Sequence, residues 1–240
     1  MGAQPRPGRR GNLLAACQPR GRATTAVQAL LVSLLTVGLI GLAPLPAAAA
    51  SGATVRAVQR NLTRLGIRVA IDGIEGPETR QGVCAARRML GHRAVSRSSV
   101  TSADLRAVRN AARLPRPRQG SAYLSVDQTC QMVYQARGGR WVRIMKASTG
   151  RAGHRTPNGS YRVTWRWPGW HSSSRYPSDR PEGNMYNSLY FRSGGYAIHG
   201  SRSVPYSPVS HGCVRISVAN ARRIFPTVPN GTRVFVYGVP

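Results

Sequence analysis

A proline-containing segment at residues 114–120 (LPRPRQG) divides the chain into two parts whose apolar residues follow different periods. Pro115 and Pro117 have a fixed φ and no amide hydrogen, so neither a helix nor a central strand continues through them. Before this segment the apolar residues recur at helical intervals, and after it they alternate as in strands. We therefore expect an α+β chain, with a small three-helix part at residues 53–113, a semi-rigid linker at 114–120 and a mostly-β domain at 121–240.

Three helices are predicted in the first part. Apolar residues from Val55 to Leu65 recur at steps of three and four, and Gly66 follows as a helix stop. A second helix begins at Pro77, where a missing amide hydrogen costs little. A third extends over residues 101–113 from a start, TSAD, that is typical of a capped helix.

Short runs of alternating apolar residues predict the strands of the second part. They lie at residues 123–127, 130–134, 141–145, 160–165, 186–192 and 234–237, and one helix is expected at 218–225. Residues 165–183 are rich in aromatic residues and loop formers. We expect them to form a loop that is either a lid or wall over a ligand or a hydrophobic brace for the sheet.

Residues 1–50 have the pattern of an export signal. Arginines precede an uncharged apolar run at residues 26–43, and small residues follow it, so we expect export with cleavage near Ala49. The alternatives are an uncleaved segment that anchors the chain in a membrane and twin-arginine export directed by Arg9-Arg10. Lipidation at Cys17 is disfavoured because this cysteine precedes the apolar run.

The chain carries 35 basic and 7 acidic residues, a formal net charge of +28. Such a charge favours a polyanionic partner. The arginines are spread along the chain without a basic helix or an aromatic-interleaved patch, and export is predicted, so no nucleic acid partner is expected. We expect anionic wall polymers instead, and membrane contact only through an uncleaved signal segment. A GC-rich coding bias is the alternative explanation, because Lys146 is the sole lysine.

His199 and Cys213 lie in two short motifs, AIHGS at residues 197–201 and SHGCVR at residues 210–215. A cysteine is a strong nucleophile only as the thiolate, and a neighbouring imidazole that takes the thiol proton is a common way to form it. A glycine before the cysteine lets backbone amides face an oxyanion, and the charge of Arg215 favours the thiolate. The pattern predicts an acyl-transfer site. The alternative is a buried structural cysteine beside an unrelated histidine.

Three cysteines remain after residue 50, and an exported chain permits disulfides. The odd count implies one bridge and one free thiol. If Cys213 is the nucleophile, Cys84 and Cys130 are left to pair and would join the two parts of the chain. Two buried unpaired thiols are the alternative. No cysteines or histidines have the Cys-x-x-Cys type of spacing, so neither a metal nor a cofactor is expected.

The two motifs together resemble the signature of the L,D-transpeptidase (YkuD-like) family of bacterial cell-wall enzymes. The sequences TPNG at residues 156–159 and NGTRVFV at residues 230–236 fit the same family, and the resemblance extends over about residues 121–238. One departure is Asn220, where many relatives carry an aspartate. The resemblance implies a mostly-β catalytic domain that acts on peptidoglycan stem peptides outside the cytoplasm, in association with the cell wall.

The resemblance also implies roles for particular residues. Cys213 is expected to be the nucleophile and His199 its general base, with the backbone carbonyl of Gly200 orienting the imidazole. Backbone amides of Gly212 and Cys213 are expected to stabilise the oxyanion. His211 is the alternative base. Ser210 and Arg215 are expected to position substrate or to brace the loop, and His211 to shape the loop and contact substrate. The aromatic residues expected to line the donor groove are Tyr190, Tyr196 and Tyr206.

The reaction implied by the family is a cross-link between the third-position diamino acids of two stems, through a thioester on Cys213. Carbapenems are expected to acylate the same thiol. Two alternatives use the same site: hydrolysis by an L,D-carboxypeptidase and exchange with a free D-amino acid. A non-catalytic peptidoglycan-binding protein is the third.

The helical part resembles a peptidoglycan-binding domain. The resemblance rests on VQxxLxxLG at residues 58–66 and DGxxGPxT at residues 72–79. It departs from that pattern at Ala86-Arg87-Arg88, where an aromatic residue and a glutamine are usual. The alternative is a helical module that packs on the catalytic domain without binding glycan.

Overall fold

The structure, a computed structural model, describes residues 51–94, 100–117 and 122–240. The expected export signal at residues 1–50 and the end of the expected linker lie outside the described residues. Within these ranges the chain has four α helices and nine strands, which confirms the predicted α+β class. None of the described helices is both long and apolar enough to cross a bilayer.

The three N-terminal helices form where periodicity predicts them: α1 (Gly52–Arg64), α2 (Pro77–Met89) and α3 (Ser102–Asn110). Side-chain caps explain two of the starts. Ser51 Oγ accepts from the Thr54 amide ahead of α1, and Thr101 and Asp104 form a reciprocal capping box on α3. Helix α3 ends earlier than expected because the backbone is already extended at Ala111.

Gln59 of α1 holds the loop between α1 and α2. Its side chain is fully buried, and its amide nitrogen donates to Asp72 Oδ1 (2.8 Å), the Ile74 carbonyl (3.1 Å) and Thr79 Oγ1 (3.0 Å). Its amide oxygen accepts from the Gly73 amide (2.9 Å). The residues that resemble a peptidoglycan-binding domain therefore fix this loop on its helix, because buried polar groups need such partners.

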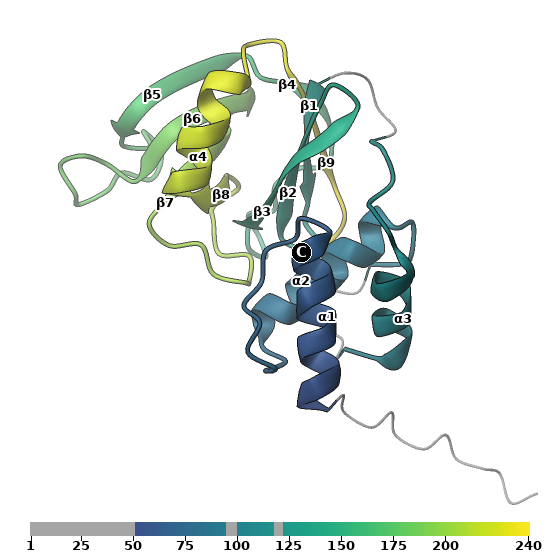
Figure 1. The fold of residues 1–240 in the computed structure, drawn as a ribbon. Coiled ribbons are helices and arrows are strands. Elements are labelled where there is room, and N and C mark those ends of the chain that lie inside the picture. Colours follow the sequence, from purple (N-terminus) through teal and green to yellow (C-terminus); the bar gives the residue numbers. More distant parts are fainter. Residues whose placement is uncertain (1–50, 95–99, 118–121) are drawn as a thin grey trace, which may run out of the picture. The chain divides into compact units, whose positions relative to one another are not determined.

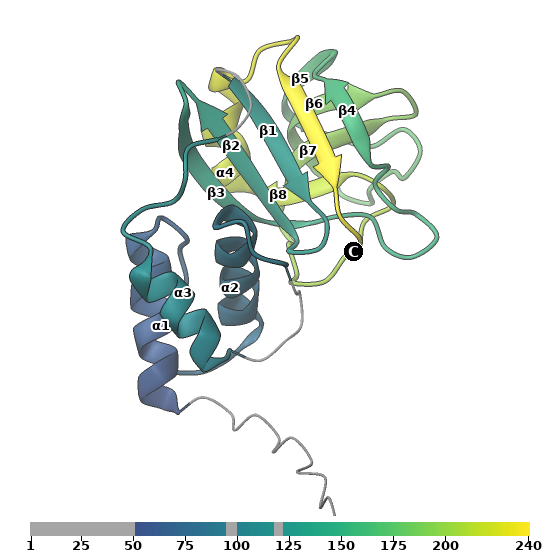
Figure 2. The ribbon, with the colours of Figure 1, turned by 90° about the vertical axis from the view of Figure 1, so that its right-hand side faces the viewer.

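The described strands form one sheet in the order β4-β9-β1-β2-β3-β8-β7-β6-β5. Two neighbouring pairs among them, β1 with β9 and β7 with β8, are parallel, and the others are antiparallel. Figure 2 shows β9 between β1 and β4. The bounds are β1 (Ala122–Asp127), β2 (Met132–Arg137), β3 (Arg140–Ser148), β4 (Gly159–Arg162), β5 (Trp165–His171), β6 (Met185–Arg192), β7 (Tyr196–Ser201), β8 (Val214–Ser217) and β9 (Arg233–Tyr237).

Helix α4 (Val218–Ile224) packs against β6, β7 and β8, as Figure 1 shows. It is followed by a short 3-10 turn, η1 (Phe225–Thr227). Ala221 is buried in the core that these strands share. Gly200 permits the close approach of β7, since a Cβ there would lie 2.9 Å from Ala221 Cβ.

Strand β5 corrects the expectation that residues 165–183 form a loop, because residues 165–171 pair with β6. Aromatic contacts favour this pairing. Trp165 stacks on Tyr190 of β6 with ring centroids 4.7 Å apart, and Trp170 contacts Tyr186 of β6 at 5.0 Å. The sequence analysis also assigned no strand at β7 or β8, the two strands beside the His/Cys motifs.

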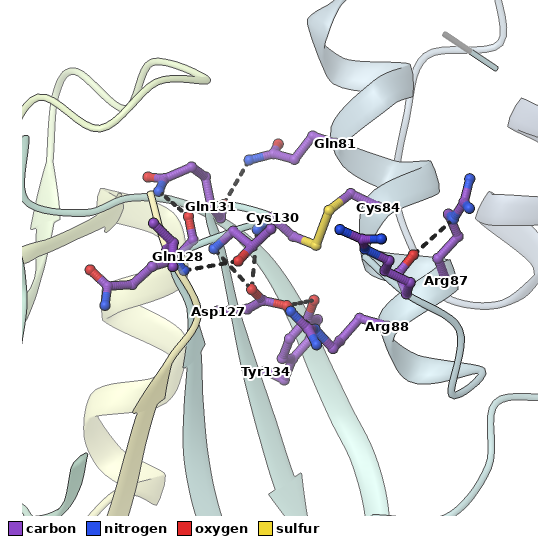
Figure 3. Close-up of a disulfide and its surroundings, with 12 residues drawn as sticks. Gln81, Cys84, Arg87, Arg88, Asp127, Gln128, Cys130, Gln131 and Tyr134 are labelled. Carbon is purple, nitrogen blue, oxygen red and sulfur yellow. Dashed lines mark hydrogen bonds and ion pairs between the residues drawn. A yellow bond between two sulfur atoms is a disulfide. The ribbon is translucent and has the colours of Figure 1, made fainter. Parts of the chain in front are cut away.

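A disulfide between Cys84 and Cys130 joins α2 to the turn after β1 (Figure 3). Both cysteines are buried, whereas Cys213 is a free, partly exposed thiol. This is the arrangement that the sequence analysis expects if Cys213 is the nucleophile.

Polar contacts surround the disulfide. Arg88 Nε of α2 lies 3.0 Å from Asp127 Oδ2, and Gln81 Nε2 donates to the Gln131 carbonyl at 2.6 Å (Figure 3). Burial raises the pKa of Asp127, and the charge of Arg88 opposes that shift. The helices and the sheet also share one buried cluster, and the described residues group into a single compact unit.

Removing the disulfide should lower the free energy of unfolding. The two cysteines are 46 residues apart, and closing a loop of that length stabilises by about 4 kcal/mol. We expect a Cys84→Ala/Cys130→Ala variant to unfold at a lower temperature in calorimetry. Cys213→Ala is the matched control, because its thiol closes no loop. Equal unfolding temperatures for the double variant and the wild type would contradict the prediction.

Candidate active site

The parallel pairing of β7 with β8 brings the two motifs together. His199 lies within β7, and Cys213 immediately precedes β8. In the register of the pair, Ile198 is opposite Val214 and His199 is opposite Arg215. Parallel neighbours need a crossover connection, and here the residues between the strands supply it.

A cavity of about 700 Å³ lies over this pair of strands. Cys213 and His199 line it together with five of the expected substrate-contacting residues: Tyr190, Tyr196, Ser210, His211 and Arg215. Residues of the segment 173–184, which follows β5, form another part of its lining. The structure therefore places a free thiol, an imidazole and these side chains around one space.

Tyr206 does not belong to this group, which corrects the sequence expectation. It lines a separate cavity of about 370 Å³ beside the disulfide, with Arg80 and Gln131. Its ring lies under the ammonium group of Lys146, 3.5 Å from Nζ to the centroid. The loop leads Tyr206 away because the Ser207 carbonyl accepts from Ser148 Oγ (2.7 Å) at the end of β3.

His199 is held as a neutral base. Its side chain is buried, and Nδ1 lies 3.0 Å from the Gly200 carbonyl oxygen, which can only accept, so Nδ1 carries the proton and Nε2 keeps a lone pair. Burial lowers the pKa of the imidazole to about 4, and the charges of Arg215 and His171 act in the same direction. The Gly200 carbonyl thus lies where the predicted third member of the site requires it.

Cys213 is also neutral at rest. Its thiol donates to the Gly195 carbonyl at 3.4 Å. Burial raises the pKa of the thiol above its ordinary value, and the Ala197 amide and the charge of Arg215 oppose the shift without cancelling it. The expectation that Arg215 favours the thiolate is right in sign, but burial outweighs it. The site therefore holds a thiol and an imidazole, not a preformed ion pair.

The backbone before Cys213 requires a glycine. Gly212 has φ +121°, and a Cβ there would lie 2.7 Å from the ring of Tyr196. Its amide donates to Ser210 Oγ at 3.1 Å, and the same hydroxyl donates to the Cys213 carbonyl. The Gly212 amide, which was expected to face the oxyanion, is thus bonded within the loop, and the hydroxyl of Ser210 braces that loop, one of the two roles expected of it.

Thr156 supports this loop from the far side. Its Oγ1 donates to the Gly212 carbonyl (2.8 Å) and accepts from the Gly150 amide (3.1 Å). Gly150 is needed because a Cβ there would lie 2.0 Å from the His154 carbonyl oxygen. The sequence analysis used the TPNG motif only as a family resemblance, and the motif was the signal that pointed to Thr156.

The sequence analysis did not anticipate two histidines, His171 and His154, that contact residues lining the cavity. His171 Nε2 lies 2.9 Å from the hydroxyl of Tyr190. His211 stacks on Tyr176, with ring centroids 4.0 Å apart, and meets the edge of His154. His211 is thus held against the 173–184 segment.

The cavity is cationic. Among the described residues that line it, four are arginines (Arg175, Arg180, Arg202 and Arg215) and none is acidic. Arg202 pairs with Glu182 at 2.5 Å. Within the described ranges, no group of three His, Cys, Asp or Glu side chains suits a metal ion.

The comparisons with known proteins identify the family of this chain. The model of the L,D-transpeptidase catalytic domain (YkuD) matches residues 121–236. A solved L,D-transpeptidase from Xylanimonas cellulosilytica is 34% identical, covering 80% of this chain and 97% of that chain, with a TM-score of 0.56. The chain belongs to the L,D-transpeptidase family, a family of enzymes that act on peptidoglycan peptides.

Other solved structures are more distant. An L,D-transpeptidase from Stackebrandtia nassauensis is 19% identical, covering 78% of this chain and 92% of that chain, with a TM-score of 0.49. The L,D-transpeptidase LdtMt1 in complex with imipenem is 24% identical, covering 49% and 59%, with a TM-score of 0.43. None of the curated proteins compared matches this chain.

The lowered pKa of His199 predicts how the rate of acylation depends on pH. A protonated imidazole accepts no proton, so acylation of Cys213 by imipenem should fall as pH drops through about 4, not through the range of an exposed histidine. The rate constant is measured by intact-protein mass from about pH 3 to 8, with circular dichroism at each pH as the folding control. A midpoint between pH 6 and 7 on a folded protein would contradict it.

Proposed function

We propose that this protein is an exported cell-wall L,D-transpeptidase that forms peptidoglycan cross-links between third-position diamino acids. One observation carries the proposal: a buried neutral imidazole, with Nδ1 on the Gly200 carbonyl and Nε2 free to accept, lies in one cavity with the free thiol of Cys213. That pair suits acyl transfer through a thioester.

The first step releases D-alanine. His199 Nε2 takes the thiol proton as Cys213 Sγ attacks the carbonyl of the third residue of a tetrapeptide stem. The oxyanion is stabilised by the Cys213 amide, since the Gly212 amide is bonded to Ser210. The C–N bond to D-alanine then breaks, His199 returns its proton to the leaving amine, and a thioester remains.

The second step joins two stems. The side-chain amine of a third-position diamino acid on another stem attacks the thioester carbonyl, and His199 takes a proton from that nitrogen. The C–S bond breaks, and the thiolate recovers its proton from the imidazolium. The product is an amide between two third residues, with Cys213 and His199 in their starting forms.

The lining of the cavity supports recognition of an anionic substrate. Stem peptides carry carboxylates, and the arginines of the described lining suit them, with Arg202 already paired with Glu182. Arg215 lies opposite His199 and is placed to bind a carboxylate near the scissile bond. Tyr190, Tyr196 and His211 would form the walls of the donor groove, with the 173–184 segment as its outer wall.

The remaining parts of the chain have proposed roles as well. Residues 1–50 would direct export, residues 53–113 would form a helical peptidoglycan-binding-like domain, residues 114–120 a linker, and residues 121–240 the catalytic domain. The net charge of +28 would favour contact with anionic wall polymers.

Acylation by imipenem tests the catalytic pair. We expect one adduct on the wild type and none on Cys213→Ala, because the thiol is the acceptor. His199→Gln should slow acylation by about 10²- to 10⁴-fold, the range for loss of a general base, whereas His211→Gln should slow it much less. Intact-protein mass measures each rate. A larger loss in His211→Gln than in His199→Gln would make His211 the base.

Product analysis tests the acceptor. Mass spectrometry of stem peptides incubated with the enzyme should give dimers linked through the two third residues. Trimmed tripeptides without dimers would mean an L,D-carboxypeptidase, and stems with a substituted terminal residue would mean exchange. If the wild type takes no imipenem adduct and yields no product but sediments with peptidoglycan, the non-catalytic alternative replaces the proposal.

A further inference from the structure

Gln131 has an unusual backbone for its residue type. It ends the turn between β1 and β2 with φ +53°, in the left-handed region that residues other than glycine and asparagine rarely adopt. It is also 95% buried, with 5% of its surface exposed. Such a conformation persists only where surrounding contacts hold it.

The side chain of Gln131 is bonded to Thr149. Its Oε1 accepts from the Thr149 amide (2.8 Å), and its Nε2 donates to Thr149 Oγ1 (2.9 Å) and to the Gln128 carbonyl. Thr149 follows β3 and is fully buried. The position of the Thr149 backbone is therefore set by one amide side chain from the neighbouring turn.

Thr149 in turn holds the loop that carries Cys213, residues 202–213, which we call the nucleophile loop. Its carbonyl accepts from the Ser210 amide at 3.1 Å, and Gly150 forms a parallel bridge with Ser210. Ser210 Oγ then joins the Gly212 amide and the Cys213 carbonyl. Through their hydrogen bonds, Thr149 and Ser210 thus connect the side chain of Gln131 to the backbone of Cys213.

The same residue is tied to the helical part. The Gln131 carbonyl accepts from Gln81 Nε2 of α2 (2.6 Å) and from the Ala147 amide (2.8 Å). Its neighbour Cys130 is bonded to Cys84 of α2, and Figure 3 shows both connections side by side. Gln131 therefore contacts both α2 and Thr149, the residue that holds the nucleophile loop.

From this geometry we propose that Gln131 is a positioning residue for acyl transfer. It acts through Thr149 and Ser210 to set where the Cys213 thiol and amide lie, and it makes the rate of acylation depend on the docking of α2. This inference rests on the proposed function. Displacements of about 1 Å at a reacting group reduce rates strongly, so a change at Gln131 should reach the chemical step without touching substrate.

The test compares two glutamines of one hairpin. Gln131→Asn keeps a residue that tolerates the left-handed backbone but shortens the reach to Thr149. Gln135→Asn is the matched control, because Gln135 lies buried on β2 and bonds Thr227 Oγ1 (2.9 Å), a partner outside the nucleophile loop. The measurements are the first-order acylation constant at saturating imipenem, the half-saturating concentration and the unfolding temperature.

We expect Gln131→Asn to lower the first-order constant by about tenfold and to leave the half-saturating concentration within about twofold, because the cavity walls are intact. Gln135→Asn should lower only the unfolding temperature. A folded Gln131→Asn with the wild-type first-order constant, or an equal loss in both variants, would overturn the inference. A wild type that takes no adduct would instead overturn the proposed function.

If Gln131→Asn does not fold, the variant Thr149→Val tests the same inference. Valine keeps the volume of threonine and removes the hydroxyl that joins Gln131 Nε2. We expect its first-order constant to fall by about threefold. A folded Thr149→Val that is acylated at the wild-type rate would overturn the inference.

Discussion

The parallel pairing of β7 with β8 is the constraint on which the rest of the site depends. A histidine and a cysteine in separate motifs become neighbours because His199 lies opposite Arg215, two residues beyond Cys213. Parallel strands cannot be joined by a tight turn, so the chain between them must cross over, and it forms part of the cavity as it does so. Helix α4 covers these strands on one face and keeps their backbone out of water.

Burial of His199 and Cys213 also sets their charge states. It lowers the pKa of His199 and raises the pKa of Cys213, so the same loss of solvent drives both groups to their uncharged forms. The Gly200 carbonyl then decides which imidazole nitrogen keeps the proton. A carboxylate in that position would add a third charge to a buried site, whereas a carbonyl orients the ring without one.

Local patterns in the sequence predicted the helices, most strands, the cysteine pairing and the Cys/His site. The strands β7 and β8 were missed because their residues were interpreted only as motifs around His199 and Cys213. Their strand structure depends on pairing with distant segments, since β7 lies between β6 and β8, and β8 lies between β3 and β7. Tyr206 was misplaced because proximity in sequence says little about which way a proline-rich loop leads. The role of Thr156 depends on a hydrogen bond to Gly212, a residue in a distant segment, which no local pattern encodes. The Gly212 amide is bonded within its own loop to Ser210, and that contact depends on the loop geometry.

The position of Asp127 affects whether the helical part and the β domain of such chains can be exchanged separately. Its carboxyl group is fully buried at the end of β1, and its countercharge comes from Arg88 on a helix that belongs to the other part of the chain. Breaking a buried ion pair by removing one partner costs about 3–5 kcal/mol, since the remaining charge stays unpaired. A β domain transplanted without α2 would therefore lose this countercharge together with the apolar cover that the helix provides for Met132 and Tyr134, so the two parts of the chain would exchange more readily as a unit than singly.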